Sequence, residues 1–206
     1  MSKLKILQYG DKILRTPSKE VQKFSNKIQS LIDDLFDTMY AQNGVGLAAP
    51  QIGHNYRVFV IDAAGENEPR NPMVFVNPKI ILKAGAFMSY EGCLSFPETY
   101  TNVRRYSDII VRAKDRKGRT FTVEASDGCL LARAIQHEND HLDGILFIDH
   151  ARNRFVTDEE LALKGLPPID SDYLLEEEEL EKMIQDQEKQ HLEQIMKEQQ
   201  AKKEKE

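Results

Sequence analysis

Hydrophobic residues recur at helical spacing in one segment of the first quarter of the chain. Between residues 25 and 42 they are separated by three or four positions, the period of one helix face. They are Ile28, Leu31, Ile32, Leu35, Met39 and Tyr40. Ser25 can cap the first turn, and Asn43-Gly44 is typical of a helix end. The pattern predicts an amphipathic helix over residues 25–42.

Extended segments follow this helix and are rich in Val, Ile and Phe, with Gly, Pro and Asn between them. They are residues 57–62 (RVFVID), 73–78 (MVFVNP), 79–89 (KIILKAGAFMS) and 145–149 (ILFID). A hairpin is predicted for residues 108–115 and 119–125, with its turn at Arg116-Lys117-Gly118.

A second helix is predicted from near Ser126-Asp127 to Leu142, where Asp143-Gly144 ends it. Its apolar stripe consists of Leu130, Leu131, Ala134, Ile135 and Leu142. Because strands and helices do not alternate regularly, we expect an α+β fold. Small antiparallel or mixed sheets would pack around this second helix.

The composition changes after the last predicted strand. We expect a catalytic domain over residues 1–150, a linker over residues 151–172 and a charged, helical C-terminal extension over residues 173–206. This extension carries 11 acidic and 6 basic side chains, so −5 of the formal net charge of −6 lies there. The nearly neutral remainder argues against DNA binding.

The chain has no apolar run of the roughly 18 residues that a membrane-spanning helix needs. The N-terminus lacks the apolar core of a signal peptide, because Lys5, Gln8 and Asp11 interrupt it. Cys93 and Cys129 are therefore not expected to form a disulfide, and a cytoplasmic location is expected.

Candidate chemistry lies on the second predicted helix, in QHENDH at residues 136–141. His137 and His141 are four residues apart, so both rings lie on one helix face and can bind the same ion. Glu138 stands where the HExxH pattern has its general base. The alternative is a pair of ordinary helix histidines. Downstream, His150 and His191 lie in no recognisable ligand arrangement, so a third ligand is sought upstream.

Two upstream motifs are each ambiguous. Cys93 in EGCLS (residues 91–95) is either a thiolate ligand or a small buried side chain. GVGLAAPQ (residues 44–51) either brings the backbone close to a ligand or forms a helix stop and a turn.

Together and in this order, GxGLAAxQ, EGCLS and QHExDH closely resemble the peptide deformylases, from about Leu7 to Asp149. The resemblance implies that Cys93, His137 and His141 bind a metal, with water in the fourth position, and that Glu138 is general base and acid. The implied activity removes the formyl group from the N-terminal formylmethionine of new polypeptides, releasing formate.

The resemblance also implies how substrate is held. Val45 and Gly46 look like edge backbone against which the peptide lies, with Gly92 on the other side, and Leu130 helps line a methionine pocket. The Gln51 amide and the Leu94 N–H would receive the negative charge that develops on the formyl oxygen.

The affinity order predicts that a Cys-His-His site holds Zn(II) more tightly than Fe(II). The resemblance nevertheless implies Fe(II), one per chain, with Zn(II), Ni(II) or Co(II) able to substitute. Glu91 and Arg105 either fix the cysteine segment as an ion pair or form a weak surface pair. Asp140 either orients a ligand histidine or faces solvent.

The expected partners are formylmethionine-bearing nascent peptides, with the ribosome near the exit tunnel as a candidate. The acidic extension offers no basic face for RNA. Two positions depart from the family. Tyr100 occupies the place of a substrate-contacting arginine, and Cys129 that of a glycine, with Gly128 one residue early.

Two other classes compete with this interpretation. A different HExxH metallopeptidase would not need Cys93 or Gln51. A protein with a structural metal would close its site with four ligands, whereas three are evident here.

Overall fold

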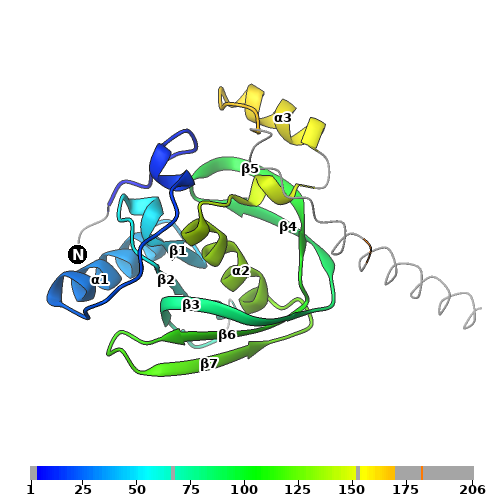
Figure 1. Ribbon diagram of the computed structural model, residues 1–206. Coiled ribbons are helices and arrows are strands. Elements are labelled where there is room, and N and C mark those ends of the chain that lie inside the picture. The colour runs from blue at the N-terminus through cyan, green and yellow to red at the C-terminus, as the bar shows by residue number, and fades with distance from the viewer. Residues whose placement is uncertain (1–3, 66–67, 152–153, 170–181, 183–206) are drawn as a thin grey trace, which may run out of the picture.

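The computed structural model describes residues 4–65, 68–151, 154–169 and 182 (Figure 1). Its helices are η1 (Lys12–Arg15), α1 (Asn26–Ala41), η2 (Ala49–Ile52), α2 (Leu130–Asp143), η3 (Phe147–His150) and α3 (Arg154–Leu163), where η marks a 3-10 helix. Its strands are β1 (Gly46–Ala48), β2 (Val58–Ile61), β3 (Met73–Ala84), β4 (Phe87–Cys93), β5 (Phe96–Arg105), β6 (Asp108–Lys114) and β7 (Thr120–Ala125).

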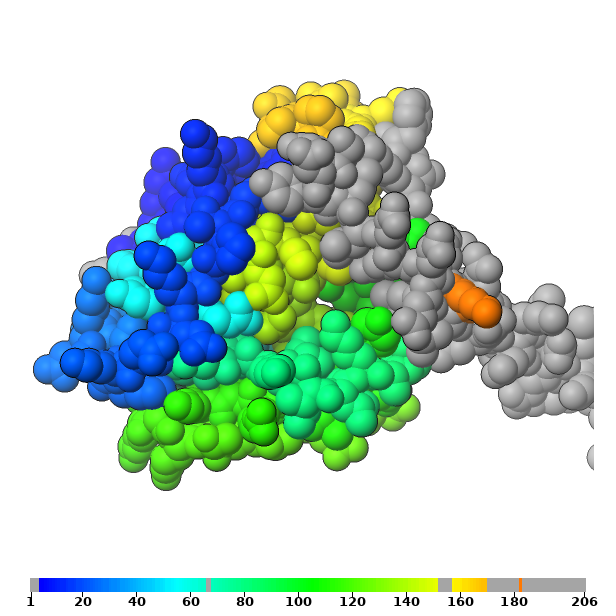
Figure 2. Space-filling view, viewed as in Figure 1, coloured from blue at the N-terminus to red at the C-terminus, as the bar shows by residue number. Residues whose placement is uncertain are grey.

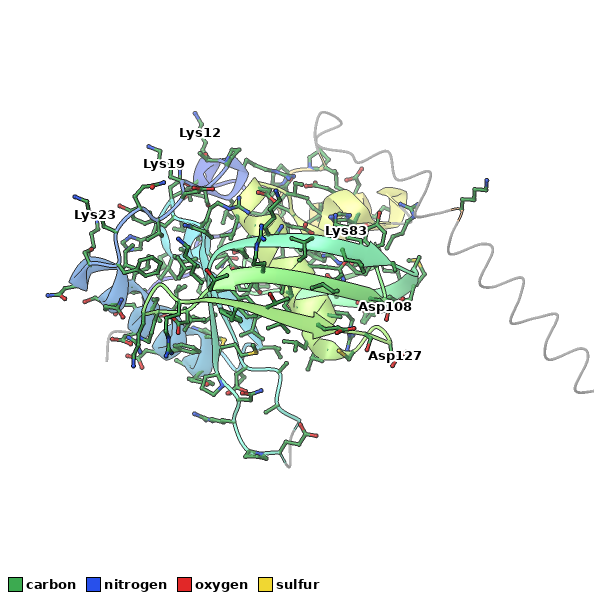
Figure 3. The ribbon with its side chains drawn as sticks, turned by 60° about the horizontal axis from the view of Figure 1, so that its bottom comes forward. Lys12, Lys19, Lys23, Lys83, Asp108 and Asp127 are labelled. Atoms are coloured by element: carbon green, nitrogen blue, oxygen red, sulfur yellow. The ribbon has the colours of Figure 1, made fainter. Side chains whose placement is uncertain are left out.

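The strands form two antiparallel sheets. The larger has the order β1-β2-β3-β6-β7, and the smaller pairs β4 with β5. Figure 3 looks onto β3, β6 and β7, with Lys83 and Asp108 near the same end of the sheet, as the pairing of Ala84 with Asp108 requires. The α+β class and the antiparallel sheets are thus confirmed.

Strand β2 explains why two helices pack on this sheet. All four of its residues are buried, and successive side chains point to opposite faces. Val58 and Val60 belong to the core cluster that contains the apolar face of α1. Phe59 and Ile61 belong to the cluster that contains the apolar stripe of α2. The two helices therefore lie on opposite faces of the β1–β2 end of the sheet.

The first predicted helix and the hairpin are confirmed, as α1 and as β6–β7. Ser25 is the N-cap residue of α1, but its side chain makes no capping hydrogen bond, so that part of the prediction is wrong. The helix is held mainly by its buried face.

Three other predicted boundaries are wrong: the division at residue 78, the continuity of the 79–89 segment, which is interrupted at residues 85–86 between β3 and β4, and the start of α2. Residues 73–84 form one strand that continues through Pro78, because a bulge between Val76 and Lys79 accommodates the missing N–H. Helix α2 starts at Leu130 instead of near Ser126, because Asp127 and Gly128 have positive φ angles of 58° and 60°.

Residues 145–149 do not return to a sheet. Phe147–His150 is the 3-10 helix η3, and the Asp149 carboxylate accepts the N–H of Leu146 at its start. Asp149 is also paired with Arg15 of η1. This ion pair joins the segment to the N-terminal part of the chain, while Phe147 packs edge-on against Phe96 of β5.

The predicted linker contains α3, and Leu161 and Ile169 are buried in one cluster with Leu14, Phe96 and Phe147. The proposed helical extension over residues 173–206 lies outside the described residues, apart from Lys182. The division into domain, linker and extension stays a prediction. Within the described residues, no helix combines the length and apolarity that a bilayer crossing requires.

Candidate metal centre

Three potential ligand side chains, two from α2 and one from the end of β4, lie close together. The ligand atoms of Cys93, His137 and His141 all lie within 4.8 Å of one another, and Cys93 Sγ is 3.3 Å from His141 Nε2. Ligands of one tetrahedral ion at ordinary Zn–S and Zn–N distances would lie about 3.3–3.5 Å apart. The arrangement of the donors therefore fits a single divalent ion.

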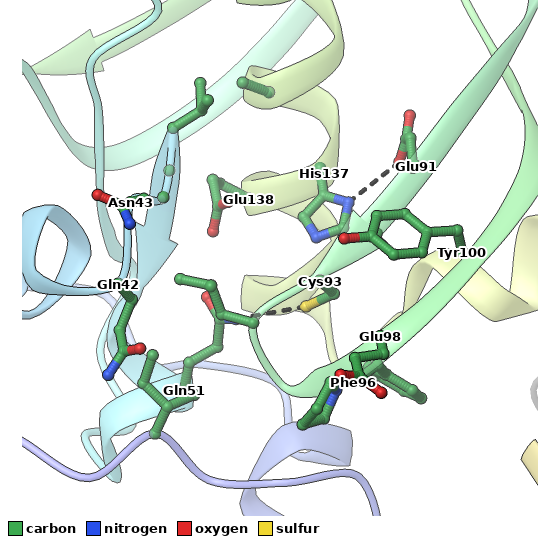
Figure 4. Close-up of a pocket in the computed structure, with 18 of the residues that line it drawn as sticks. Gln42, Asn43, Gln51, Glu91, Cys93, Phe96, Glu98, Tyr100, His137 and Glu138 are labelled. Atoms are coloured by element: carbon green, nitrogen blue, oxygen red, sulfur yellow. Dashed lines mark hydrogen bonds and ion pairs between the residues drawn. The ribbon is translucent and has the colours of Figure 1, made fainter. Parts of the chain in front are cut away.

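The position of Cys93 follows from the end of strand β4. The β4–β5 register shifts between Gly92 and Cys93, and Cys93 pairs with Phe96 across a tight connection. The thiol points toward the cavity from this irregular strand end, facing the helix that carries His137 (Figure 4). The site thus joins one strand end to one helix face.

A chain of buried charges orients the first histidine. Glu91 Oε2 lies 3.0 Å from His137 Nδ1, which leaves Nε2 of that ring to face the donor cluster. Arg105 donates two 2.9 Å hydrogen bonds to the Glu91 carboxylate. It also donates one 2.5 Å bond to Asp140, which lies 2.9 Å from His150 Nε2. Glu91 and Arg105 therefore form a buried pair.

Asp140 does not contact a predicted ligand histidine directly; its described partners are Arg105 and His150. Burial alone would raise the pKa of Glu91 and of Asp140, but Arg105 and the neighbouring histidines outweigh it and hold both pKa values well below the usual range. Both carboxylates are therefore ionised at neutral pH.

The second histidine is suited to donate a lone pair. Burial lowers the pKa of His141 well below its usual value, so the ring is neutral at pH 7. For His137, burial also lowers the pKa, but hydrogen bonds to Cys93 and Glu91 outweigh it and raise the pKa. A neutral imidazole is the form that binds metals, so His141 is already in that form and His137 would release its proton when an ion binds.

Glu138 is a buried carboxylate beside these donors. Its side chain is 4% exposed, and its Oε2 has no hydrogen-bond partner among the described residues. Burial is the largest cause that raises its pKa to about 7, and the charges of Glu91 and Asp140 add to the effect. A carboxylate with this pKa can take up and release a proton near neutral pH.

Gly46 lets the β1 backbone approach Glu138. A Cβ at this position would lie 2.5 Å from Glu138 Oε1 and 2.9 Å from its Cγ and Cδ, so any other residue would displace this buried side chain. Gly46, the second glycine of GVGLAAPQ, is therefore required by the contact between β1 and α2. It is not simply a helix stop.

Gln51 is buried and its amide is fixed at both ends. Its Oε1 accepts the Ala48 N–H at 2.9 Å. Its Nε2 donates to Ser95 Oγ at 3.3 Å and approaches Cys93 Sγ at 3.5 Å. Leu94 lines the same cavity from the connection between β4 and β5.

A cavity of about 950 Å³ opens above these groups. Four further predicted residues line it: Val45, Gly46, Gly92 and Leu130. Strand β1 is at the end of its sheet, and β4 has one partner within the described sheets, so both have an unpaired edge. In Figure 2, α2 is visible only between the N-terminal segments in blue and cyan and the strands in green.

The ten predicted site residues therefore line or adjoin one cavity. Sequence reasoning did not single out Tyr90, Arg133 and Ser95 as site residues, although Tyr90 and Arg133 line the cavity and Ser95 holds Gln51. The sequence feature that could have indicated Ser95 is its position in the EGCLS motif. Tyr90 and Arg133 carry no signal, because pocket lining depends on how β4 faces α2.

The fold and this site define a metal-binding hydrolase, and comparison with known proteins specifies which kind. The model of the polypeptide deformylase family matches residues 3–155. Peptide deformylase 1 of Shewanella oneidensis is 45% identical over 150 residues, which are 73% of this chain and 87% of that protein. The peptide deformylase of Heliobacterium modesticaldum is 48% identical over 153 residues, 74% of this chain and 97% of that protein.

Among solved structures, a peptide deformylase from Synechococcus elongatus in complex with actinonin matches with a TM-score of 0.76 and 40% identity, covering 84% of this chain and 91% of that one. The chain belongs to the polypeptide deformylase family. It is a metal-dependent hydrolase that removes the formyl group from the N-terminal formylmethionine of newly synthesised polypeptides.

Proposed function

We propose that Cys93, His137 and His141 hold one metal ion, and that this ion is Fe(II) in the native enzyme. The proposal is supported by the donor atoms within 4.8 Å of one another and by the resemblance of the three motifs to deformylases. Zn(II), Ni(II) or Co(II) can substitute, because the same soft and borderline donors suit them. When bound, the ion supplies a Lewis acid that makes water a nucleophile at neutral pH.

Glu138 is the proposed general base and acid. Its carboxylate accepts the proton of the attacking water and then delivers it to the nitrogen that leaves as the free amine. Burial, which raises the pKa of Glu138 to about 7, suits both steps, because a group near its pKa exchanges protons in either direction. The close approach of Gly46 to Glu138 Oε1 restricts where the carboxylate can turn.

Gln51 and Leu94 are the proposed donors to the developing oxyanion. Attack on the formyl carbon places negative charge on its oxygen, and an N–H already aimed there stabilises it by about 3–4 kcal/mol. Gln51 supplies its side-chain N–H, held by the Ala48 and Ser95 contacts. Leu94 supplies its backbone N–H.

Substrate is proposed to lie extended between two strand edges. Val45 and Gly46 of the β1 side and Gly92 of β4 offer backbone groups at unpaired edges, the mode by which strands recruit peptides. Leu130 at the start of α2 helps line the pocket for the methionine side chain. In this arrangement α2, which carries HExxH, is the central element of the catalytic domain over residues 1–150.

The clustering of one thiol and two imidazoles beside a buried carboxylate carries this proposal. The test is formate release from formyl-Met-Ala-Ser by protein prepared anaerobically with Fe(II). Activity lost on aerobic handling and restored with Fe(II) supports iron as the native ion. Equal activity of the zinc and iron forms contradicts it.

Two further measurements test the ligands and the reaction class. Cys93→Ser is expected to lower metal content, and an unchanged metal content removes Cys93 from the ligand set. Unformylated peptides separate deformylation from peptidase activity, since only a peptidase of another type would cleave them.

We also propose a cytoplasmic location and, as a partner, the ribosome near the exit tunnel, because the substrate is a nascent chain. Neither proposal assigns a role to the acidic extension.

A further inference from the structure

Two stacked tyrosines stand at the edge of the cavity. The rings of Tyr90 on β4 and Tyr100 on β5 have centroids 5.7 Å apart and an interplanar angle of 19°. Tyr90 is 65% exposed and Tyr100 is 50% exposed, and both line the cavity. Large aromatic side chains are usually buried, but these two rings are exposed. They therefore form an accessible aromatic surface next to the donor cluster.

Gly92 allows the ring of Tyr100 to take this position. The two residues are partners in the β4–β5 register, and a Cβ at Gly92 would lie 2.5 Å from the Tyr100 ring. The ring therefore lies across the β4 backbone, where any other residue would displace it. In Figure 4 Tyr100 extends from β5 into the cavity on the side of His137 and Cys93.

If the proposed function is correct, a bound peptide passes next to Tyr90 and Tyr100, and this step rests on that function. The formyl end must lie at Cys93, so a peptide along the β4 edge runs from Cys93 past Gly92 toward Tyr90. An extended chain rises about 3.3 Å per residue, and Gly92 and Tyr90 are two residues apart on their strand. The two residues after the methionine therefore come beside the tyrosine rings.

We propose that Tyr90 and Tyr100 are specificity-determining residues that favour an aromatic side chain at one of the two positions after the formylmethionine. Stacking onto a preformed pair requires little ordering of the enzyme, because the rings already support each other. The family resemblance leaves this preference open, since Tyr100 replaces an arginine that some deformylases carry. A ring favours apolar and aromatic partners, whereas an arginine favours hydrogen-bond acceptors.

The test compares kcat/KM for formyl-Met-Phe-Ala, formyl-Met-Ala-Phe and formyl-Met-Ala-Ala. We expect one of the phenylalanine peptides to exceed the alanine peptide by about 2- to 12-fold, the range of one aromatic pair. Tyr90→Leu and Tyr100→Leu are expected to reduce that ratio toward one. The change should appear in KM, because the contact is the same in the ground state and the transition state.

Two control variants sharpen the result. Tyr100→Phe keeps the ring and is expected to keep the ratio. Tyr56→Leu removes a tyrosine that lies outside the cavity lining, and its ratio is expected to match the wild type.

Three outcomes overturn the inference: a wild-type ratio of one at both positions, an unchanged ratio in both leucine variants, or equal loss in Tyr100→Phe and Tyr100→Leu. The last would assign the effect to the hydroxyl. If the wild type releases no formate from any of the three peptides, the proposed function itself fails. Normal turnover without aromatic preference leaves the proposed function intact and removes only this inference.

Discussion

Helices α1 and α2 pack on opposite faces of the same strands, yet they bury different side chains. The buried residues of α1 are Ile28, Leu31, Ile32, Leu35, Thr38 and Met39. Those of α2 are Ala132, Ala134, Ile135, Gln136, Glu138, His141 and Leu142. The single buried polar side chain of α1, Thr38, accepts the N–H of Leu4. Helix α2 buries an amide, a carboxylate and an imidazole.

The two helices differ in the free-energy cost of the polar groups that they bury. Gln136 is fully paired, because its amide bonds both the N–H and the carbonyl of Tyr106. Glu138 Oε2 and His141 Nδ1 have no partner among the described residues. Burying such groups costs free energy and is expected where chemistry needs them. Helix α1 stabilises the fold, and α2 is the helix that we propose to carry the reaction.

The largest expected effect comes from Glu138→Ala. Formate release should fall by about 10²- to 10⁴-fold, because the proton transfer loses its base and acid, while metal content stays at one ion per chain. The matched control is Asn139→Ala, one residue along α2, whose side chain bonds Asp143 and does not line the cavity. Deformylation at the normal rate by the Glu138 variant would show that the base is assigned wrongly.

Arg105→Met should lower both stability and metal affinity. The Glu91 and Asp140 carboxylates would lose their shared cation, at a cost of about 3–5 kcal/mol in the free energy of unfolding. Since Glu91 orients His137, metal binding should weaken by about 10- to 100-fold.

Urea unfolding and metal titration measure the two effects of Arg105→Met. Arg119→Met is the control, since Arg119 pairs with Asp115 at the surface and should change stability by less than about 1 kcal/mol. An effect of Arg105→Met no larger than this control would mean that the network is unimportant.

On the opposite face of the sheet, Leu35→Ala should affect stability alone. Leu35 is fully buried in the core cluster between α1 and the sheet, so its truncation should cost about 2–5 kcal/mol in the free energy of unfolding. Activity per folded molecule and metal affinity should not change. A specific loss of activity would break the contrast between the two helices.

Tyr40→Phe gives the smallest effect and depends on pH. The Tyr40 hydroxyl donates a 2.7 Å hydrogen bond to Asp62, a contact expected to contribute about 1–2 kcal/mol. Burial and the Asp62 contact raise the pKa of Tyr40 to about 12. Burial would raise the pKa of Asp62, but Tyr40, two backbone N–H groups and Arg70 outweigh it and lower that pKa.

These two pKa shifts determine how the stability of the protein changes with pH. The Asp62 contribution is present above the usual pKa near 4 and is lost as the pH falls through the lowered value. The Tyr40 contribution is present below the usual pKa near 10 and is lost as the pH rises from about 10 to 12. The urea midpoint of Tyr40→Phe should therefore change less than that of the wild type, both at the acidic and at the alkaline end of the pH range. Parallel curves for the two proteins would contradict this.

The sequence predicted the elements whose pattern is local. Helix α1 and the β6–β7 hairpin were predicted because periodicity and turn residues lie within the segment itself. The start of α2 and the fate of residues 145–149 were predicted wrongly, because they depend on the backbone of Asp127 and on the pairing of Asp149 with Arg15. A distant partner leaves no local pattern.

The candidate site divides in the same way. The spacing of His137 and His141 alone places both rings on one helix face, and the motif order supplies Cys93. Whether Glu91 and Arg105 form a buried pair or a surface pair could not be decided from the residues, since burial is a property of the packed molecule. The same holds for Tyr90, which lines the cavity only because β4 faces α2.

The sequence by itself determined which side chains are available for the proposed chemistry: two imidazoles one helical turn apart, a carboxylate beside them and a thiol in a short motif. Tertiary structure alone decided that Cys93 meets the histidines and that Glu138 is buried against Gly46. The reason is physical. Side-chain type and local periodicity are written along the chain, whereas distance and desolvation arise only when strand ends and helix faces from different segments pack together.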